Sequence, residues 1–240
     1  MPHPYRAGRA HLQFPTTSWD LLADLSRRGE QSAAALNEFA DRYYAAVRAF
    51  ISAIARNPLD AEDFTQRFFE TVVLSGPLLA RADPKKGSFR PYLKRAIRNF
   101  IVDEHRRAMR TVNPDIRPDA LDDGWDAVVS ESSPGPDQAL LREWARSLVA
   151  MALERLERAC QSNDQTQHFQ LFVHRYVTDA EHPPPWREVG EVFGLPEKIA
   201  RSRAETAARR FRVLLRDLIA SDIGAEGDID QELHAVMAVL

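Results

Sequence analysis

The stretch FRPYLKRAIRNFIVDEHRR, residues 89–107, carries two stripes of side chains at helical spacing. Its apolar residues recur every three or four positions, which predicts an amphipathic helix; they are Phe89, Leu93, Ile97, Phe100 and Ile101. Beside them, Arg90, Lys94 and Arg98 form a cationic stripe. Like charges four residues apart share a helix face and repel by roughly 0.2–0.5 kcal/mol. An anion opposite the stripe would remove this repulsion, so the stripe predicts a polyanionic partner.

The composition is close to that of soluble globular proteins, with 44% hydrophobic and 28% charged residues. A length of 240 residues predicts one large or two small domains. The single cysteine, Cys160, excludes an internal disulfide framework and fits a reducing compartment. The N-terminal residues lack the apolar core of a signal peptide, and no run of apolar residues is long enough for a membrane span. We therefore expect a cytoplasmic protein without a membrane partner.

The formal net charge of -3 hides segments of opposite sign. Residues 85–110 hold nine Lys or Arg against two acids, and residues 198–216 hold seven against one. Residues 111–138 reverse this balance, with seven acids against one Arg, and residues 222–240 hold five acids and no Lys or Arg. This pattern predicts two basic modules, separated and followed by acidic segments.

Apolar periodicity predicts helices throughout, because Pro and Gly gather between the periodic stretches and strand-like alternation is missing. We expect one helix over 36–56, a second from Asp60 as N-cap to residue 74, and a third after Ser88 as N-cap. Asp137 is expected to cap a later helix. The predicted fold is all-α, with two small helical domains. Its parts are an N-terminal extension (1–35), a first helical domain (36–110), an acidic linker (111–136), a second helical domain (137–221) and an acidic tail (222–240).

Residues 186–219, WREVGEVFGLPEKIARSRAETAARRFRVLLRDLI, predict a helix-turn-helix. Gly194 suits the end of the first helix because glycine tolerates positive φ. Gly190 lies where two crossing helices would approach closely, and Leu195 can fill the gap between them. The N-terminal end of the second helix would enter the major groove of DNA; it offers Glu197, Lys198, Arg201, Ser202 and Arg203. Similar pieces also occur in ordinary helical bundles.

Three motifs occur in an order that resembles an extracytoplasmic-function (ECF) type sigma factor of bacterial RNA polymerase. They are DAEDFTQRFF (60–69), the stretch 89–107 and EVGEVFGLPEKIARSR (188–203), with the acidic linker before the third. The resemblance covers 36–110 as sigma region 2 and 137–219 as sigma region 4, and FPTTSWDLL (14–22) is similar to the leader of one subgroup. It implies a protein that binds core RNA polymerase, recognises a two-part promoter and assists promoter melting.

The resemblance also implies roles for individual residues. The helix from residue 60 would dock on the clamp of the largest polymerase subunit, and region 4 would meet the flap; the clamp contacts would be Asp60, Asp63, Gln66 and Phe69. The loop 79–88 and the helix after it would capture a displaced base of the minus-ten element, through Arg90, Tyr92, Lys94, Arg95, Arg98, Asn99 and Arg106. The minus-thirty-five element would be bound by Glu197, Lys198, Arg201, Ser202 and Arg203.

Each of these assignments has a structural alternative. Asp60 and Asp63 would also stabilise a helix start without any partner. Tyr92 can be buried beside Leu93, and basic side chains can simply be solvated. Ala200 stands where the family usually has a larger aliphatic residue, which puts the base contacts of the second helix in question. The acidic linker would either thread a basic channel of the polymerase or act as a soluble tether.

The alternative function is a helix-turn-helix regulator that binds duplex DNA without polymerase, although such a regulator does not require the first module. The sequence shows no phosphate-binding glycine loop, no HExxH motif and no paired CxxC. We therefore expect no catalytic residue, no metal and no cofactor. The acidic tail could fold onto a basic surface as an internal inhibitor, remain solvated, or cap the second module as a helix. An anti-sigma factor, or a kinase acting on Thr65, are further partners that the sequence leaves open.

Overall fold

The structure is a computed structural model, and it describes Leu21, 30–55, 58–74, Leu78, 89–112, 135–178, 181–223 and 228–239. Every element within these residues is a helix, which confirms the all-α prediction for this part of the chain. The segment 14–22 apart from Leu21, the loop 79–88 with Ser88, and residues 113–134 of the linker lie outside the described residues. The predictions made for them stay predictions.

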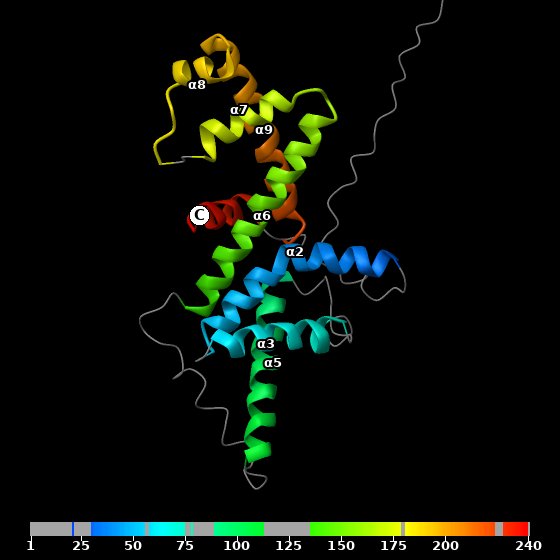
Figure 1. Cartoon of the computed structure of the whole chain (residues 1–240). Helices are drawn as coiled ribbons and strands as arrows, with labels where there is room; N and C mark the ends of the chain where they lie inside the picture. The colour runs from blue at the N-terminus through cyan, green and yellow to red at the C-terminus, as the bar shows by residue number, and fades with distance from the viewer. Residues whose placement is uncertain are drawn as a thin grey trace, which may run out of the picture.

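The described helices form two groups that are connected by one long helix, α6 (Figure 1). The first group lies before α6 in the chain and the second lies mostly after it. In chain order the elements are α2 (Glu30–Ser52), α3 (Pro58–Phe68), the π-helix η1 (Phe69–Leu74), α5 (Phe89–Val112), α6 (Pro136–Gln161), α7 (Thr166–Tyr176), α8 (Trp186–Phe193), α9 (Glu197–Ala220) and α10 (Ile229–Met237).

The first group, α2, α3 with η1, and α5, closes around aromatic side chains. The apolar stripe predicted for residues 89–107 faces this core, since Phe89, Leu93 and Ile97 are fully buried. The ring centroid of Phe89 lies 6.0 Å from that of Phe39 and 5.1 Å from that of Tyr43. Ring pairs of this kind add about 0.5–1.5 kcal/mol to the burial of apolar area. The amphipathic pattern of the α5 sequence is therefore confirmed.

In the second group, α8 and α9 are joined by a short turn at the residues where the sequence predicts one. Gly194 ends α8 with a φ of 64°, in the left-handed region that glycine adopts without steric penalty. Gly190 is buried where α8 approaches the start of α9, and a Cβ atom there would lie 2.7 Å from the carbonyl oxygen of Leu195. The side chain of Leu195 packs against a small core, which consists of Leu171, Val189, Ala200 and Ala204.

The two groups share one apolar core, because α6 runs from the first group to the second (Figure 1). Leu140, Trp144 and Leu148 of α6 belong to the same buried cluster as Phe39 of α2 and Leu218 of α9. α2 packs along α6 more extensively than any other pair of elements packs in the described structure. The domain boundaries predicted from the sequence are not tested by this packing and stay predictions.

A buried ion pair lies where the two groups meet. The side chain of Arg42 in α2 is fully buried, and its Nη1 donates to Asp222 Oδ1 at 3.2 Å and to Ser221 Oγ at 2.9 Å. Trp144 Nε1 of α6 donates to Oδ2 of the same aspartate at 2.8 Å. Burial by itself lowers the pKa of Arg42, but Asp222, Tyr43 and Glu38 together outweigh it and leave the pKa raised. The arginine is therefore charged and paired in the core.

Three helix starts differ from the prediction. α2 runs from Glu30 to Ser52, so it begins six residues before and ends four residues before the predicted range of 36–56. The other two differences occur at prolines. α3 begins at Pro58, so Asp60 lies in the first turn and is not the N-cap. α6 begins at Pro136 with Gly135 as its N-cap, so Asp137 lies one residue inside the helix. The reason is that proline is favoured at the first helical position, where its missing N–H leaves no hydrogen bond unmade. Both aspartates still place a negative charge at the positive end of a helix dipole.

The helix predicted over residues 60–74 is divided into two parts. It is α-helical to Phe68 and π-helical from Phe69 to Leu74. Phe69 and Val73 of the π-helical part are buried. A single turn of π-helix is rare and inserts one residue per turn, which apolar spacing in one sequence does not reveal.

The close approach of α8 and α9 gives a stability prediction. Gly190→Ala would place a methyl group 2.7 Å from a main-chain oxygen, which cannot turn away as a side chain can. We expect the free energy of unfolding to fall by about 1–3 kcal/mol, as overpacking does. Gly135→Ala is the steric control, because nothing lies within 4 Å of a Cβ atom there, and it should lose only the smaller preference of an N-cap for glycine over alanine. Denaturant unfolding followed by circular dichroism measures both variants, and equal stabilities would contradict the described contact.

Candidate nucleic-acid interface

The cationic stripe of α5 forms ion pairs with carboxylates of the chain's own later helices. Arg90 forms an ion pair with Glu232 of α10. Lys94 Nζ lies 3.2 Å from Asp137 Oδ2, and Arg98 Nη2 lies 3.3 Å from Asp137 Oδ1, at the start of α6. The sequence predicts an anion opposite this stripe, and in the described structure intramolecular carboxylates occupy that position.

Arg90 is the most enclosed residue of the stripe. Its guanidinium lies over the ring of Trp144, 4.4 Å from the centroid, on the side chain that also donates to Asp222. The side chains of Arg90 and Glu232 are only 21% and 20% exposed. A partly desolvated cation on an aromatic face is stabilised by about 1–2 kcal/mol, more than an exposed pair. Arg90 is therefore held by two contacts from outside its own helix.

A second strip of α5 remains open. Arg95 and Asn99 are exposed and lie four residues apart on one face of the helix. Arg106, further along α5, lies 4.0 Å from Asp103. Tyr92 is half-buried, and its hydroxyl donates to the carbonyl oxygen of Leu78. Of the seven residues predicted to contact the minus-ten element, Arg95, Arg98 and Asn99 are therefore exposed, and of these three Arg98 pairs with Asp137.

The residues predicted to contact polymerase are divided between surface and core. Asp60, Asp63 and Gln66 are exposed on α3, and Asp63 pairs with Arg67 at 2.7 Å. Phe69 is 8% exposed, and its ring lies 5.1 Å from that of Tyr44. Its side chain supports the bundle in this conformation, so a polymerase contact through it would require the side chain to leave the ring cluster.

The same helix contains two features that the sequence prediction missed. Glu62 accepts a hydrogen bond from Tyr44 Oη at 2.7 Å and one from Arg48 Nε at 2.7 Å. These hydrogen bonds lower the pKa of Glu62, so it stays charged beside the exposed acids of α3. Thr65 is fully buried and donates to the carbonyl oxygen of Ala61 at 2.7 Å. Its hydroxyl is therefore inaccessible to a kinase in this conformation.

The N-terminal end of α9 presents most of the residues predicted for it. Glu197, Lys198, Arg201 and Ser202 are exposed, and Arg201 Nε donates to Glu205 at 2.8 Å. Arg203 is half-buried and donates to Gln167 of α7. It is therefore turned toward α7 and away from the exposed end. Ala200, the position where a larger residue was expected, is fully buried beneath this end.

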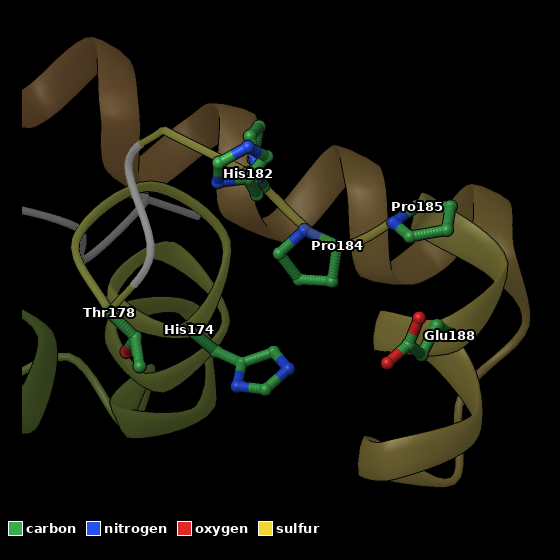
Figure 2. Close-up of a pocket in the computed structure, with 7 residues that line it drawn as sticks. His174, Thr178, His182, Pro184, Pro185 and Glu188 are labelled. Carbon is green, nitrogen blue, oxygen red and sulfur yellow. The ribbon is translucent and has the colours of Figure 1, made fainter.

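A cavity of about 570 Å³ lies beside α8, between the end of α7 and the three prolines at 183–185 (Figure 2). It is lined by His174, Thr178, His182, Pro183, Pro184, Pro185 and Glu188. Figure 2 shows His174 and Glu188 facing one another from α7 and α8. No group of three His, Cys, Asp or Glu residues that could hold a metal ion occurs among the described residues.

Residues 39–111 match the family model described as Sigma-70 region 2. The matched residues run from α2 to α5 and contain both the exposed acids of α3 and the cationic stripe. No curated protein and no solved structure matches the chain. The family match supports a sigma-70 family factor, the class of protein that binds RNA polymerase and recognises promoters. No helix among the described elements is long and apolar enough to cross a membrane.

His168 of α7 gives a pH prediction. Burial lowers the pKa of His168, and the nearby charges of Arg203 and Arg210 lower it further. The unfolded chain therefore binds this proton more readily, and the folded state loses stability as the pH falls below about 6.5, the ordinary pKa of histidine. His168→Gln should weaken this dependence, whereas His105→Gln, at an exposed position, should leave it unchanged.

Thermal unfolding of the three proteins across this pH range measures the effect. Equal pH dependence in the wild type and in His168→Gln would show that His168 is not held in its neutral form.

Proposed function

We propose that the chain is an ECF-type sigma factor that binds core RNA polymerase, recognises a two-part promoter and assists melting of the downstream element. The observation that carries this proposal is the region 2 family match over residues 39–111 combined with the exposed N-terminal end of α9 in the same chain. The family match indicates the class of protein. The exposed end of α9 adds a second surface, of the kind that binds duplex DNA in a helix-turn-helix.

The polymerase contact is assigned to the exposed face of α3. Asp60, Asp63 and Gln66 are solvent-accessible there, and the charged Glu62 lies beside them. Exposed acids of this kind steer a basic partner surface toward the helix and give an association rate that falls with salt. This face lies on the same bundle as α5, so docking would place α5 at a fixed position on the polymerase.

Recognition of the minus-ten element is assigned to α5. An unpaired base is bound by stacking on an aromatic or apolar side chain and by cations that follow the strand. Arg95 and Asn99 are exposed for such contacts, and Arg90, Lys94 and Arg98 would add three more if their carboxylate partners moved away.

Recognition of the minus-thirty-five element is assigned to α9. Lys198, Arg201 and Ser202 are exposed at the end of the helix that a helix-turn-helix places in the major groove. The helix α6, with 26 residues, spans about 39 Å between the two helix groups.

One observation favours the alternative function, a regulator that binds duplex DNA without polymerase. The exposed end of α9 is accessible in the described structure, whereas the three cations of the α5 stripe are paired with carboxylates. Duplex binding by α9 alone would need no change of conformation. DNA binding therefore does not distinguish the two functions, and an assay with added core polymerase is needed.

Transcription from genomic DNA separates them. Core polymerase with the full chain should yield new transcript starts, each preceded by the same two sequence elements, and core polymerase alone should not. Arg201→Ala should reduce these transcripts about tenfold, the effect of losing one base contact.

Arg158→Ala is the matched control, because Arg158 also pairs with a glutamate four residues away but lies on α6. Its transcripts should equal those of the wild type. If the wild-type chain yields no new transcript starts but binds duplex DNA in the absence of polymerase, the sigma function is contradicted and the regulator function is supported.

A further inference from the structure

The end of α9 is fixed to three other helices through one residue. The carboxylate of Asp222 binds Arg42 of α2 and Trp144 of α6, and its carbonyl oxygen accepts from the backbone N–H of Phe89 at 3.1 Å. Phe89 is the first residue of α5. The chain after α9 therefore contacts the start of the helix that carries the cationic stripe.

The following helix, α10, is docked on the body of the protein. Val236 is fully buried in the main core, and Ile229 and Leu233 pack against that core. Asp230 pairs with Arg216 of α9, and Asp228 caps α10 by accepting from two backbone N–H groups. In Figure 1 the helix lies beside α6, in agreement with its contacts.

This docking brings Glu232 to Arg90. The pair is mostly buried, and the opposite face of the guanidinium is covered by Trp144. Asp137 pairs with Lys94 and Arg98 as well, but Arg98 remains 53% exposed, so Glu232 on Arg90 is the most enclosed pair of the stripe. A carboxylate and a phosphate oxygen bind a guanidinium in the same geometry, so α10 and DNA compete for Arg90.

The docking of α10, which places Glu232 on Arg90, has two features of a reversible contact. A helix of nine residues is marginal by itself and depends on its docking surface. Arg90 Nη1 is buried without a hydrogen-bond partner among the described residues. Phosphate oxygens, with their additional acceptor sites, could satisfy this donor where Glu232 does not.

We infer that α10 is an autoinhibitory helix, which holds Glu232 on Arg90 in the free chain and leaves when the chain engages core polymerase. This inference rests on the proposed function, because it names the regulation of the minus-ten surface. The sequence left three roles open for the acidic tail, and the docked helix with its ion pair to the stripe favours the internal inhibitor.

Binding of single-stranded DNA tests the inference on the full-length chain. The probe is a fluorescein-labelled single strand of mixed sequence, and anisotropy is measured at low salt, where cation–phosphate contacts are strongest. Glu232→Gln removes the carboxylate with little change of shape and should tighten binding about tenfold, the value of one charged hydrogen bond.

Two further variants separate this effect from simpler ones. Glu154→Gln removes one negative charge from an exposed pair on α6 and should change the affinity less than about twofold, as an exposed charge does. The double variant Arg90→Gln with Glu232→Gln should not bind the single strand more tightly than the wild type does. The reason is that the arginine exposed by Glu232→Gln is then absent. Equal binding by the wild type and Glu232→Gln, an absence of binding by every variant, or an equal gain in Glu154→Gln would each overturn the inference.

Hydrogen exchange of the backbone amides of 229–237 provides the second measurement. Exchange should be slow in the free chain and faster both in Glu232→Gln and in the complex with core polymerase. Amides that remain protected in the complex would show that α10 does not leave.

The transcription assay distinguishes the failure of this inference from the failure of the proposed function. If Glu232→Gln binds DNA as the wild type does while both proteins direct transcription, the autoinhibition is wrong and the sigma function stands. If Glu232→Gln gains affinity but neither protein activates core polymerase, α10 still covers a DNA-binding surface and the sigma function is wrong.

Discussion

The ion pair between Arg42 and Asp222 is the contact on which the described arrangement depends. Both side chains are buried, and breaking a buried ion pair by removing one of its charges costs about 3–5 kcal/mol. Around this pair the chain brings together α2, the first turn of α5, the middle of α6 and the end of α9. The pair therefore fixes the first helix group against the second, in addition to the apolar packing of α2 on α6.

The position of α5 and the position of the tail follow from the same junction. Asp222 binds the first backbone N–H of α5, and α10 begins seven residues later at Ile229 and returns to the neighbouring residue, Arg90. A polymerase that separated the two helix groups would break the Asp222 contacts and remove the surface on which α10 docks. The proposed sigma function and the proposed autoinhibition are thus connected by one set of contacts, although each is tested by its own experiment.

The sequence predicts the local features of this structure better than its long-range ones. The apolar stripe of α5 and the turn at Gly194 were predictable, because both follow from helical periodicity and from the backbone freedom of glycine. The N-caps assigned to Asp60 and Asp137 were wrong, because Pro58 and Pro136 start those helices earlier. The pairing of Arg90 with Glu232 joins residues far apart in the chain, and no spacing rule reports such a contact. The stripe indicated only that an anion would lie opposite, and both DNA and an acidic helix satisfy that condition.

The closed arrangement of α5 on the carboxylates of later helices is most directly tested by zero-length carbodiimide cross-linking. Lys94 Nζ lies 3.2 Å from Asp137 Oδ2, and the other lysines of the chain are Lys85, Lys86 and Lys198. Mass spectrometry of the free, full-length protein should find Lys94 joined to Asp137, and the yield should fall when core polymerase and promoter DNA are added. If Lys94 remains uncoupled to Asp137 in the free protein while Lys198 couples to other carboxylates, the closed arrangement is contradicted.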